Sequence, residues 1–407
     1  MEFLVPRLNS ILIFLMITIT ISTSLFADNA VQLDHPSKKV TEDIITLNIS
    51  DMELRSISTS NYGLIFTYSN NEASVIYGFD TKGNQLFSQA LDRSAFKSSF
   101  LSDGSKYWVV HGFGEENIRY DIYDAISNSR RYSFNSKYWL KPYKNGVYYF
   151  CTYHPFEPCL PAVYGLNGDL LWHMDSRYGV WDIEPLDDST VLYLDGNELY
   201  IISLIDSSIK RKTIFSEFDK ASLFVGIDVS PDNKYCAVYT GYDIAIYSIV
   251  NDGKYILSSF DNSAWITNGS VILSNNACLI TYLKYSQGNI LCDIYKRDTT
   301  DSYINVVYNK ACYSTSPHTS FVDKQYYEDY TIVHIVSDDN GDPSYRSLIM
   351  RNPQPDYDSF RVMILGGYVV SSNDVYHDSL ISFTPGYNDN SGNIINKKTY
   401  APDIKKE

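Results

Sequence analysis

Val225 to Ser259 reads VGIDVSPDNKYCAVYTGYDIAIYSIVNDGKYILSS, four short apolar segments separated by turn residues. Pro231-Asp232-Asn233 and Asn251-Asp252-Gly253 are residue types that tolerate the backbone angles of tight turns. Apolar segments of this length between such turns are typical of β-strands. The stretch therefore predicts four strands, over residues 225–230, 235–240, 243–248 and 255–259.

The same pattern, a polar turn residue followed by an apolar segment, recurs along the chain. The recurring turn residues are Asn61, Asp103, Asn145, Asp188, Asp232 and Asn275. Successive members of this series are 42, 42, 43, 44 and 43 residues apart. A register held over five intervals indicates a structural repeat, and each repeat reads as four strands. Stretches with the 3.6-residue period of helices are absent, which argues against helical repeats.

Four antiparallel strands in a repeat of about 40 to 45 residues is the spacing of β-propellers. The sequence predicts an all-β fold, a single β-propeller of about seven, alternatively eight, four-stranded antiparallel blades. AVYGLNGDLLW (Ala162 to Trp172) resembles the strand–turn–strand of pyrroloquinoline-quinone-type propeller repeats. DVSPDNKYCAVY (Asp228 to Tyr239) resembles the turn of WD-like and TolB-like repeats. These resemblances imply an architecture only, because proteins of unrelated function share this turn chemistry. The adjacent cysteine pair of quinone-dependent alcohol dehydrogenases is missing, so no quinone cofactor is implied.

The N-terminus has the pattern of a secretory signal peptide. An uncharged apolar run from Ile11 to Ile21 follows one basic residue and precedes small residues that end at Ala27. The run is shorter than the roughly 20 residues of a membrane-spanning helix. We therefore expect a signal peptide over 1–27, a propeller domain over 28–385, and a secreted or periplasmic protein. A polar segment over 386–407 is expected to form a flexible C-terminal tail, and a strand near 44–49 is expected to close the ring against the last blade.

The charge balance limits the partners. Lys and Arg number 33 against 48 Asp and Glu, a formal net charge of −15. Binding to nucleic acid or to anionic lipid depends on basic residues, so neither is expected, and no membrane contact is expected after signal cleavage. We expect a monomer whose ligand is a protein, a peptide or a glycan.

Six cysteines are permissible as disulfides in an exported chain. Cys151 and Cys159 flank a short loop and are the predicted disulfide. Cys236 and Cys278 lie in apolar, strand-like runs, where buried free thiols are expected. The pairing of Cys292 and Cys312 stays open.

The repeat register also predicts a binding face. In a propeller, the connections between blades and between the second and third strands of a blade surround one mouth of the central channel. Aromatic and acidic side chains fall at these connections or at the start of the first strand. The candidate ligand-binding residues are Trp139, His154, Phe156, Trp181, Asp182, Asp228 and Trp265.

Asp182, Glu184 and Asp228 fall on predicted first strands, which line the channel. Carboxylates that converge on the axis would suit Ca²⁺, which prefers oxygen ligands, or an acid/base pair. Alternatively, they bind channel water alone. No established catalytic or metal-binding motif occurs, so no catalytic residue and no cofactor other than Ca²⁺ is suggested.

Three function classes remain open on these grounds. The favoured one is an exported, non-enzymatic binding protein that uses the channel-mouth face. The first alternative is a carbohydrate-active hydrolase or lyase that uses channel carboxylates, and the second is a cell-envelope assembly scaffold. An enzyme requires two of the three channel carboxylates close together in an open pocket, whereas a scaffold leaves them dispersed.

Overall fold

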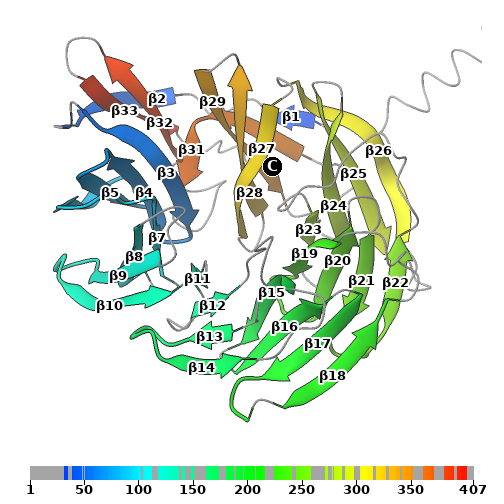
Figure 1. Ribbon diagram of the computed structural model, residues 1–407. Coiled ribbons are helices and arrows are strands. Elements are labelled where there is room, and N and C mark those ends of the chain that lie inside the picture. The colour runs from blue at the N-terminus through cyan, green and yellow to red at the C-terminus, as the bar shows by residue number, and fades with distance from the viewer. Residues whose placement is uncertain are drawn as a thin grey trace, which may run out of the picture.

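The strands of this chain stand in sheets arranged around a common axis (Figure 1). The structure is a computed structural model, which describes residues 32–34, 39–47, 49, 51–101, 104–111, 118–136, 140–142, 148–150, 162–173, 180–187, 189–195, 197–206, 208–215, 224–240, 244–257, 271–273, 277, 279–286, 289–297, 303–314, 318–326, 330–339, 342–351, 361–370, 380–388 and 392–400. The predicted signal peptide lies outside this part of the chain. No helix of the described residues is long and apolar enough to cross a membrane.

The described strands form eight sheets, which we number as blades 1 to 8 in chain order. In each blade the first strand lies nearest the axis and the fourth lies at the rim (Figure 1). Blades 1 to 4 consist of β3 (Glu53–Ser60), β4 (Gly63–Ser69), β5 (Ser74–Asp80) and β6 (Gln85–Leu91); β7 (Lys97–Phe100), β8 (Lys106–His111), β9 (Ile118–Asp124) and β10 (Arg130–Ser136); β11 (Leu140–Pro142), β12 (Tyr148–Phe150), β13 (Ala162–Tyr164) and β14 (Leu170–His173); and β15 (Val180–Asp187), β16 (Thr190–Asp195), β17 (Glu198–Ser203) and β18 (Ile209–Ile214).

Blades 5 to 8 complete the ring. They consist of β19 (Phe224–Val229), β20 (Tyr235–Thr240), β21 (Ile244–Ser248) and β22 (Lys254–Leu257); β23 (Val271–Leu273), β24 (Leu279–Ser286), β25 (Asn289–Arg297) and β26 (Tyr303–Ser314); β27 (His318–Tyr326), β28 (Tyr330–Asp339), β29 (Asp342–Arg351) and β30 (Arg361–Gly366); and β31 (Tyr368–Val370), β32 (Leu380–Asn388), β33 (Gly392–Tyr400) and β2 (Lys39–Thr46). The predicted all-β propeller is confirmed. The described strands form eight sheets, which is the alternative to the expected number of about seven blades.

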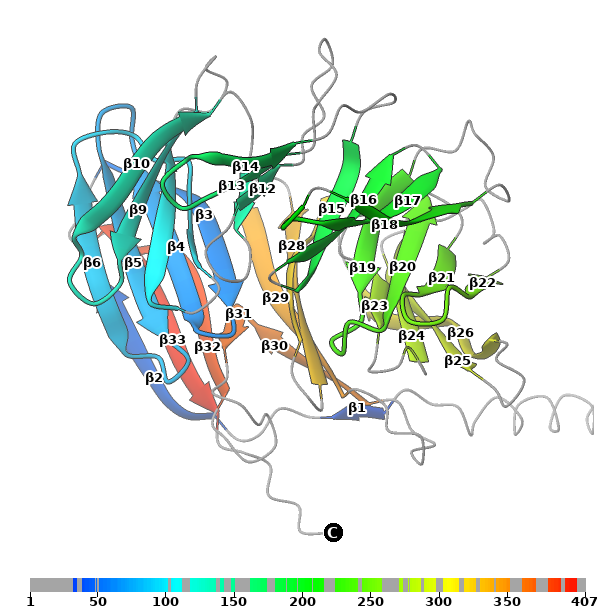
Figure 2. The same ribbon diagram turned by 90° about the horizontal axis from the view of Figure 1, so that it is seen from below.

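The N-terminal segment closes the ring, as expected from the sequence. Strand β2 is the outermost strand of blade 8 and pairs antiparallel with β33, from Lys39 opposite Tyr400 to Thr46 opposite Ile394. The short strand β1 (Gln32–Asp34) adds in parallel to β30 at the rim of blade 7. The first residues of the described chain therefore join the two last blades, and Figure 2 shows β2 beside β32 and β33.

The expected flexible tail over 386–407 is wrong for its first part. Residue 385 lies inside β32, and β33 continues the sheet to Tyr400. Ile394 and Ile395 are both buried, and as neighbours in a strand their side chains point to opposite faces, so both faces of β33 are covered. The Asn and Lys residues that gave the segment its polar composition lie half-buried beside them. Lys398 also forms an ion pair with Glu42 of β2 at 3.6 Å.

The apolar core lies between neighbouring blades rather than inside one of them. Each inter-blade cluster is built from side chains of two or three adjacent sheets; between blades 1 and 2, for example, the rings of Phe87 and Tyr107 stack with centroids 4.2 Å apart. Tyr120, Tyr193 and Tyr239 are fully buried in such clusters. The high tyrosine content therefore fills the spaces between the twisted sheets.

Cys236 is a free, fully buried thiol in β20, which confirms that prediction. Burial, with the Asp228 carboxylate nearby, raises the pKa of this thiol well above its ordinary value. Cys151, Cys159 and Cys278 lie outside the described residues.

Candidate functional site

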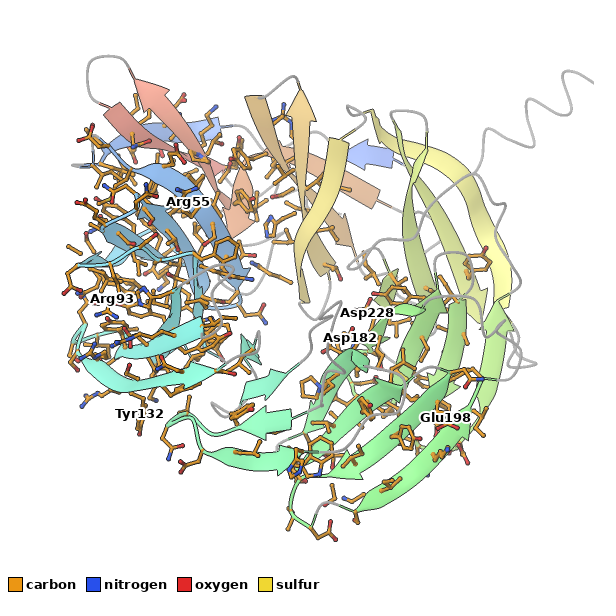
Figure 3. The ribbon with its side chains drawn as sticks, viewed as in Figure 1. Arg55, Arg93, Tyr132, Asp182, Glu198 and Asp228 are labelled. Carbon is orange, nitrogen blue, oxygen red and sulfur yellow. The ribbon has the colours of Figure 1, made fainter. Side chains whose placement is uncertain are left out.

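Two of the predicted site residues, Asp182 and Asp228, lie on the first strands of neighbouring blades, near the axis (Figure 3). Asp182 is only 2% exposed. Its Oδ1 accepts a hydrogen bond from the Ile183 amide at 3.0 Å, and its Oδ2 accepts one from the Ile227 amide of the next blade at 3.1 Å. The Asp182 carboxylate therefore ties blade 4 to blade 5.

Gly226 makes this close approach possible. A Cβ at position 226 would lie 2.7 Å from the hydroxyl oxygen of Tyr239 and 3.2 Å from Oδ2 of Asp182. Both distances are shorter than ordinary van der Waals contact, so a larger residue would push the carboxylate away from the Ile227 amide. The glycine and the aspartate, one on each blade, form a joint between the inner strands.

We expect Asp182→Ala to lower the free energy of unfolding by about 2 to 4 kcal/mol, because two amides in the protein interior lose their acceptor. Asp182→Asn keeps one acceptor oxygen in the same place and is expected to cost about half as much. Urea unfolding of the two variants measures both values. If Asp182→Ala were as stable as the natural chain, the joint would not contribute to stability.

The remaining predicted residues are only partly described. Asp228 is 7% exposed on β19, and Glu184 is half-buried on β15. Trp181 belongs to β15, but only its backbone is described. Trp139, His154, Phe156 and Trp265 lie outside the described residues, so their place at a channel mouth stays a prediction. Among the described residues no three His, Cys, Asp or Glu side chains form a group that could hold a metal ion.

A groove that sequence reasoning missed lies between blades 4 and 5. It encloses about 330 Å³ and we call it the blade 4–5 groove. Its lining includes the apolar residues Leu186, Ile201 and Ile249 and the charged residues Asp187, Lys210 and Arg211. Most of these residues lie in or beside the turns that join first to second and third to fourth strands. These turns share one face of the ring, opposite the face of the predicted channel mouth.

The charged wall of the blade 4–5 groove is held in place by hydrogen bonds. Arg211 of β18 donates to the Tyr247 hydroxyl at 3.2 Å and to the Ile249 carbonyl at 2.6 Å, both in blade 5. Partial burial would raise the pKa of Asp187, but hydrogen bonds from Ser189 outweigh it and lower that pKa. Lys210 is exposed at the rim of the groove, and its positive charge also lowers the pKa of Asp187.

Apolar side chains stand exposed on the same face. Ile126, Ile205 and Val250 are 92%, 83% and 61% exposed. Each occupies the same position, two residues after the last paired residue of the third strand, in the third-to-fourth-strand turn of blades 2, 4 and 5. Aligning the repeats would have revealed this recurrence, since the turns read DAISN, SLIDS and SIVND.

Structural comparison identifies the fold of this arrangement. KlAtg21, solved in complex with the coiled coil of AgAtg16, superimposes with a TM-score of 0.50, is 14% identical, and the match covers 78% of this chain and 98% of that one. Hsv2 of Kluyveromyces lactis superimposes with a TM-score of 0.51 at 9% identity, over 77% of this chain and 98% of that one. The chain has a β-propeller fold.

Sequence comparison adds no family. No family model matches the chain, and no curated protein sequence matches it. At such low identity the structural likeness establishes the propeller architecture alone, so function has to be argued from the chain's own surface.

Proposed function

We propose that this propeller is a non-enzymatic binding protein whose partner is another protein. The observation that carries the proposal is the blade 4–5 groove, a cavity of about 330 Å³ beside exposed apolar turn residues. Cavities of this size that combine apolar walls with a few charged groups are typical binding sites. KlAtg21, a propeller of similar fold, was solved with a protein partner, which supports a scaffold of this type.

The partner segment is expected to be acidic and to carry one large apolar side chain. The apolar side chain would fill the space between Leu186, Ile201 and Ile249. Lys210 stands exposed on β18 in a chain of net charge −15, and it provides local positive charge for an acidic flank, whereas Lys212 on the same strand is paired with Glu198 at 2.8 Å. Ile205 and Val250 would then contact the rim of the docked segment, as exposed apolar residues at interfaces do.

The proposal also includes that the protein is exported and that its ligand could be a glycan instead of a protein. Secretion rests on the sequence of residues 1–27, and a glycan ligand rests on the aromatic residues predicted for the channel mouth. The alternative of a carbohydrate-active hydrolase or lyase needs accessible carboxylates, and Asp182 and Asp228 are 2% and 7% exposed. The resemblance to pyrroloquinoline-quinone-type repeats concerns turn residues and adds no cofactor to the proposal.

Panning a displayed library of random peptides on the full chain tests the proposal. We expect the enriched peptides to carry one large apolar residue between Asp or Glu residues. Their affinity should fall about tenfold for Lys210→Glu, because a charge contact at the rim reverses sign. Lys82→Glu, at an exposed lysine in the third-to-fourth-strand turn of blade 1, is the control and should bind as the natural chain does.

Ile205→Ser with Val250→Ser tests the apolar rim in the same assay. Both side chains are exposed, so the double variant is expected to fold normally and to bind more weakly. Enriched peptides without acidic residues, or affinities equal in Lys210→Glu and Lys82→Glu, would contradict docking at the blade 4–5 groove.

A further inference from the structure

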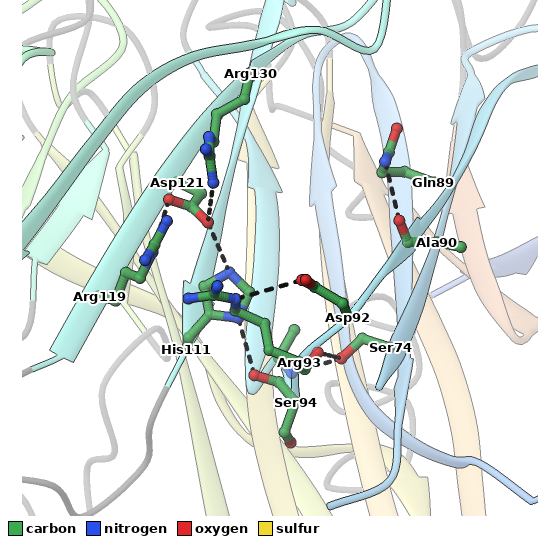
Figure 4. A network of polar contacts seen from close by, with 11 residues as sticks. Ser74, Gln89, Ala90, Asp92, Arg93, Ser94, His111, Arg119, Asp121 and Arg130 are labelled. Atoms are coloured by element: carbon green, nitrogen blue, oxygen red, sulfur yellow. Dashed lines mark hydrogen bonds and ion pairs between the residues drawn. The ribbon is translucent and has the colours of Figure 1, made fainter. Parts of the chain in front are cut away.

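A second cluster of charged residues lies on the other side of the ring, on the face of blade 2 that turns toward blade 1 (Figure 4). Arg119, Asp121 and Tyr123 alternate along β9 and therefore share this face. The strand register places His111 of β8 opposite Arg119 and Ser133 of β10 opposite Asp121. The cluster thus extends across three adjacent strands.

Asp121 is the buried centre of this cluster, with a side chain 1% exposed. Its carboxylate oxygens lie 3.0 Å from Nε of Arg119, 3.3 Å from Nε2 of His111 and 3.8 Å from Nη1 of Arg130. Burial alone would raise the pKa of Asp121, but hydrogen bonds from His111, Ser133 and Arg119 hold it well below its ordinary value. Asp121 therefore carries a full negative charge around neutral pH.

His111 links the cluster to the connection from blade 1. Its Nδ1 lies 2.9 Å from the backbone carbonyl oxygen of Ser94, in the connection from blade 1, and its Nε2 faces the Asp121 carboxylate. A carbonyl oxygen and a carboxylate both accept hydrogen bonds. His111 therefore lies between two acceptor groups, one from the blade 1 connection and one from Asp121.

The cations of the cluster outnumber its carboxylates. Arg93 joins them from the blade 1 connection, where it lies 3.7 Å from Asp92, and its charge acts on Tyr123 together with those of Arg119 and Arg130. Three arginines thus face two carboxylates, Asp92 and Asp121, within a chain of net charge −15. Holding like charges close together costs electrostatic energy, so a surplus of this kind is typical of a site that receives an anion.

The arginines keep donors available for that anion. Arg119 contacts Asp121 through Nε, and no described residue accepts a hydrogen bond from its two terminal nitrogens. The side chains of Arg93, Arg119 and Arg130 are 39%, 30% and 50% exposed, so a small ligand reaches them from solvent. The planar guanidinium group matches two oxygens of a tetrahedral oxyanion at once.

We propose that Arg119 and Arg130, with Arg93 and His111 beside them, form a binding site for a small tetrahedral oxyanion of the phosphate or sulfate type. Asp121 orients Arg119 through the contact with its Nε and holds Arg119 and Arg130 close together while no anion is bound. The site lies between blades 1 and 2 and is separate from the blade 4–5 groove, so it adds a second ligand to the proposed protein-binding function.

Calorimetric titration of the full chain with inorganic phosphate, inorganic sulfate and acetate, at one ionic strength, tests the site. We expect phosphate and sulfate to bind, and acetate to bind more weakly because it presents two oxygens and one charge.

Arg119→Gln and Arg130→Gln are each expected to weaken phosphate and sulfate binding by about tenfold or more, since each removes charge-assisted hydrogen bonds. Arg131→Gln is the matched control. This neighbouring arginine is 53% exposed and pairs with Asp124 at 3.5 Å, outside the cluster, so its loss should leave the affinity unchanged. Circular dichroism confirms that each variant is folded. Arg130 is half-exposed, so its variant carries the test if Arg119→Gln is unstable.

Three outcomes would overturn the proposal. The first is that the natural chain binds neither phosphate nor sulfate more tightly than acetate. The second is that Arg130→Gln binds them as well as Arg131→Gln does. The third is that Lys210→Glu, on the opposite side of the ring, weakens binding as much as Arg130→Gln, which would indicate non-specific attraction of anions.

Discussion

A chain that begins at Leu47 is expected to lose on the order of 5 kcal/mol of its free energy of unfolding, because it lacks the strand that closes the ring. Such a chain lacks β1 and β2, and with β2 goes a ladder that runs from Lys39 to Thr46 along β33. Strand β33 then becomes the rim strand of blade 8, paired only with β32. Thermal unfolding and urea unfolding measure the loss.

A chain that begins at Lys39 is the matched control. It loses only β1, a three-residue parallel addition to β30, and is expected to keep most of its stability. A synthetic peptide of residues 39–47 added to the shorter chain should raise its melting temperature by rebinding to β33. Equal melting temperatures of the two truncated chains, without any effect of the peptide, would contradict closure by β2.

Removing residues 388–407 is expected to be as damaging as removing β2. A flexible tail could be removed with little loss of stability. The deleted segment instead contains β33, which lies between β32 and β2, so its loss leaves β2 without a partner. The side chain of Asn393 also donates to the carbonyl oxygens of Ile49 at 3.0 Å and Met52 at 2.8 Å, which fixes the start of blade 1.

Gly63→Ala is expected to cost at least about 3 kcal/mol. Gly63 begins β4 with a φ of +142°, which side chains rarely adopt. An added Cβ would lie 1.9 Å from the carbonyl oxygen of Phe79, inside the ladder between β4 and β5. The clash is with backbone, so no side chain can move aside, and blade 1 would have to distort.

Gly386→Ala provides the control for this substitution. Gly386 also lies in a strand, but a Cβ there would meet no atom closer than 3.4 Å. The free energy of unfolding of the Gly386→Ala variant should therefore differ from that of the natural chain by less than about 1 kcal/mol. Urea unfolding of both variants under identical conditions checks the pair, and similar losses in the two would show that the backbone of Gly63 can relax.

The blade pattern could be predicted from the sequence because it depends on local turn chemistry. Asn233 and Asp252 adopt positive φ angles of 58° and 56°, as their turns require, and Asp232 accepts a hydrogen bond from the Lys234 amide. These turn residues lie within a few positions of one another, so they can be recognised in the sequence alone. The same reasoning failed for β33, because its half-buried Asn and Lys residues gave this strand the composition of a loop.

The sites could not be predicted in the same way, because their residues meet only after the blades pack. Asp182 was predicted to face a ligand, yet it accepts an amide 45 residues away, across a blade boundary. The buried state of Asp121 depends equally on residues from the connection to blade 1. The third-to-fourth-strand turns are an exception, because Ile126, Ile205 and Val250 recur in one register and would have emerged from aligned repeats.

The pairing of the first strand with the last has a consequence for how the protein is made. Ile49 and Asn393, which meet in the finished ring, are 344 residues apart. At the usual speed of ribosomes the N-terminal strand waits on the order of 20 to 70 s before its partner is synthesised. During that time blades 1 to 6 can form in sequence, while the face of blade 1 that blade 8 covers stays uncovered. The nascent chain is therefore a natural client for chaperones, and each molecule becomes a ring only after its own C-terminal hairpin has emerged.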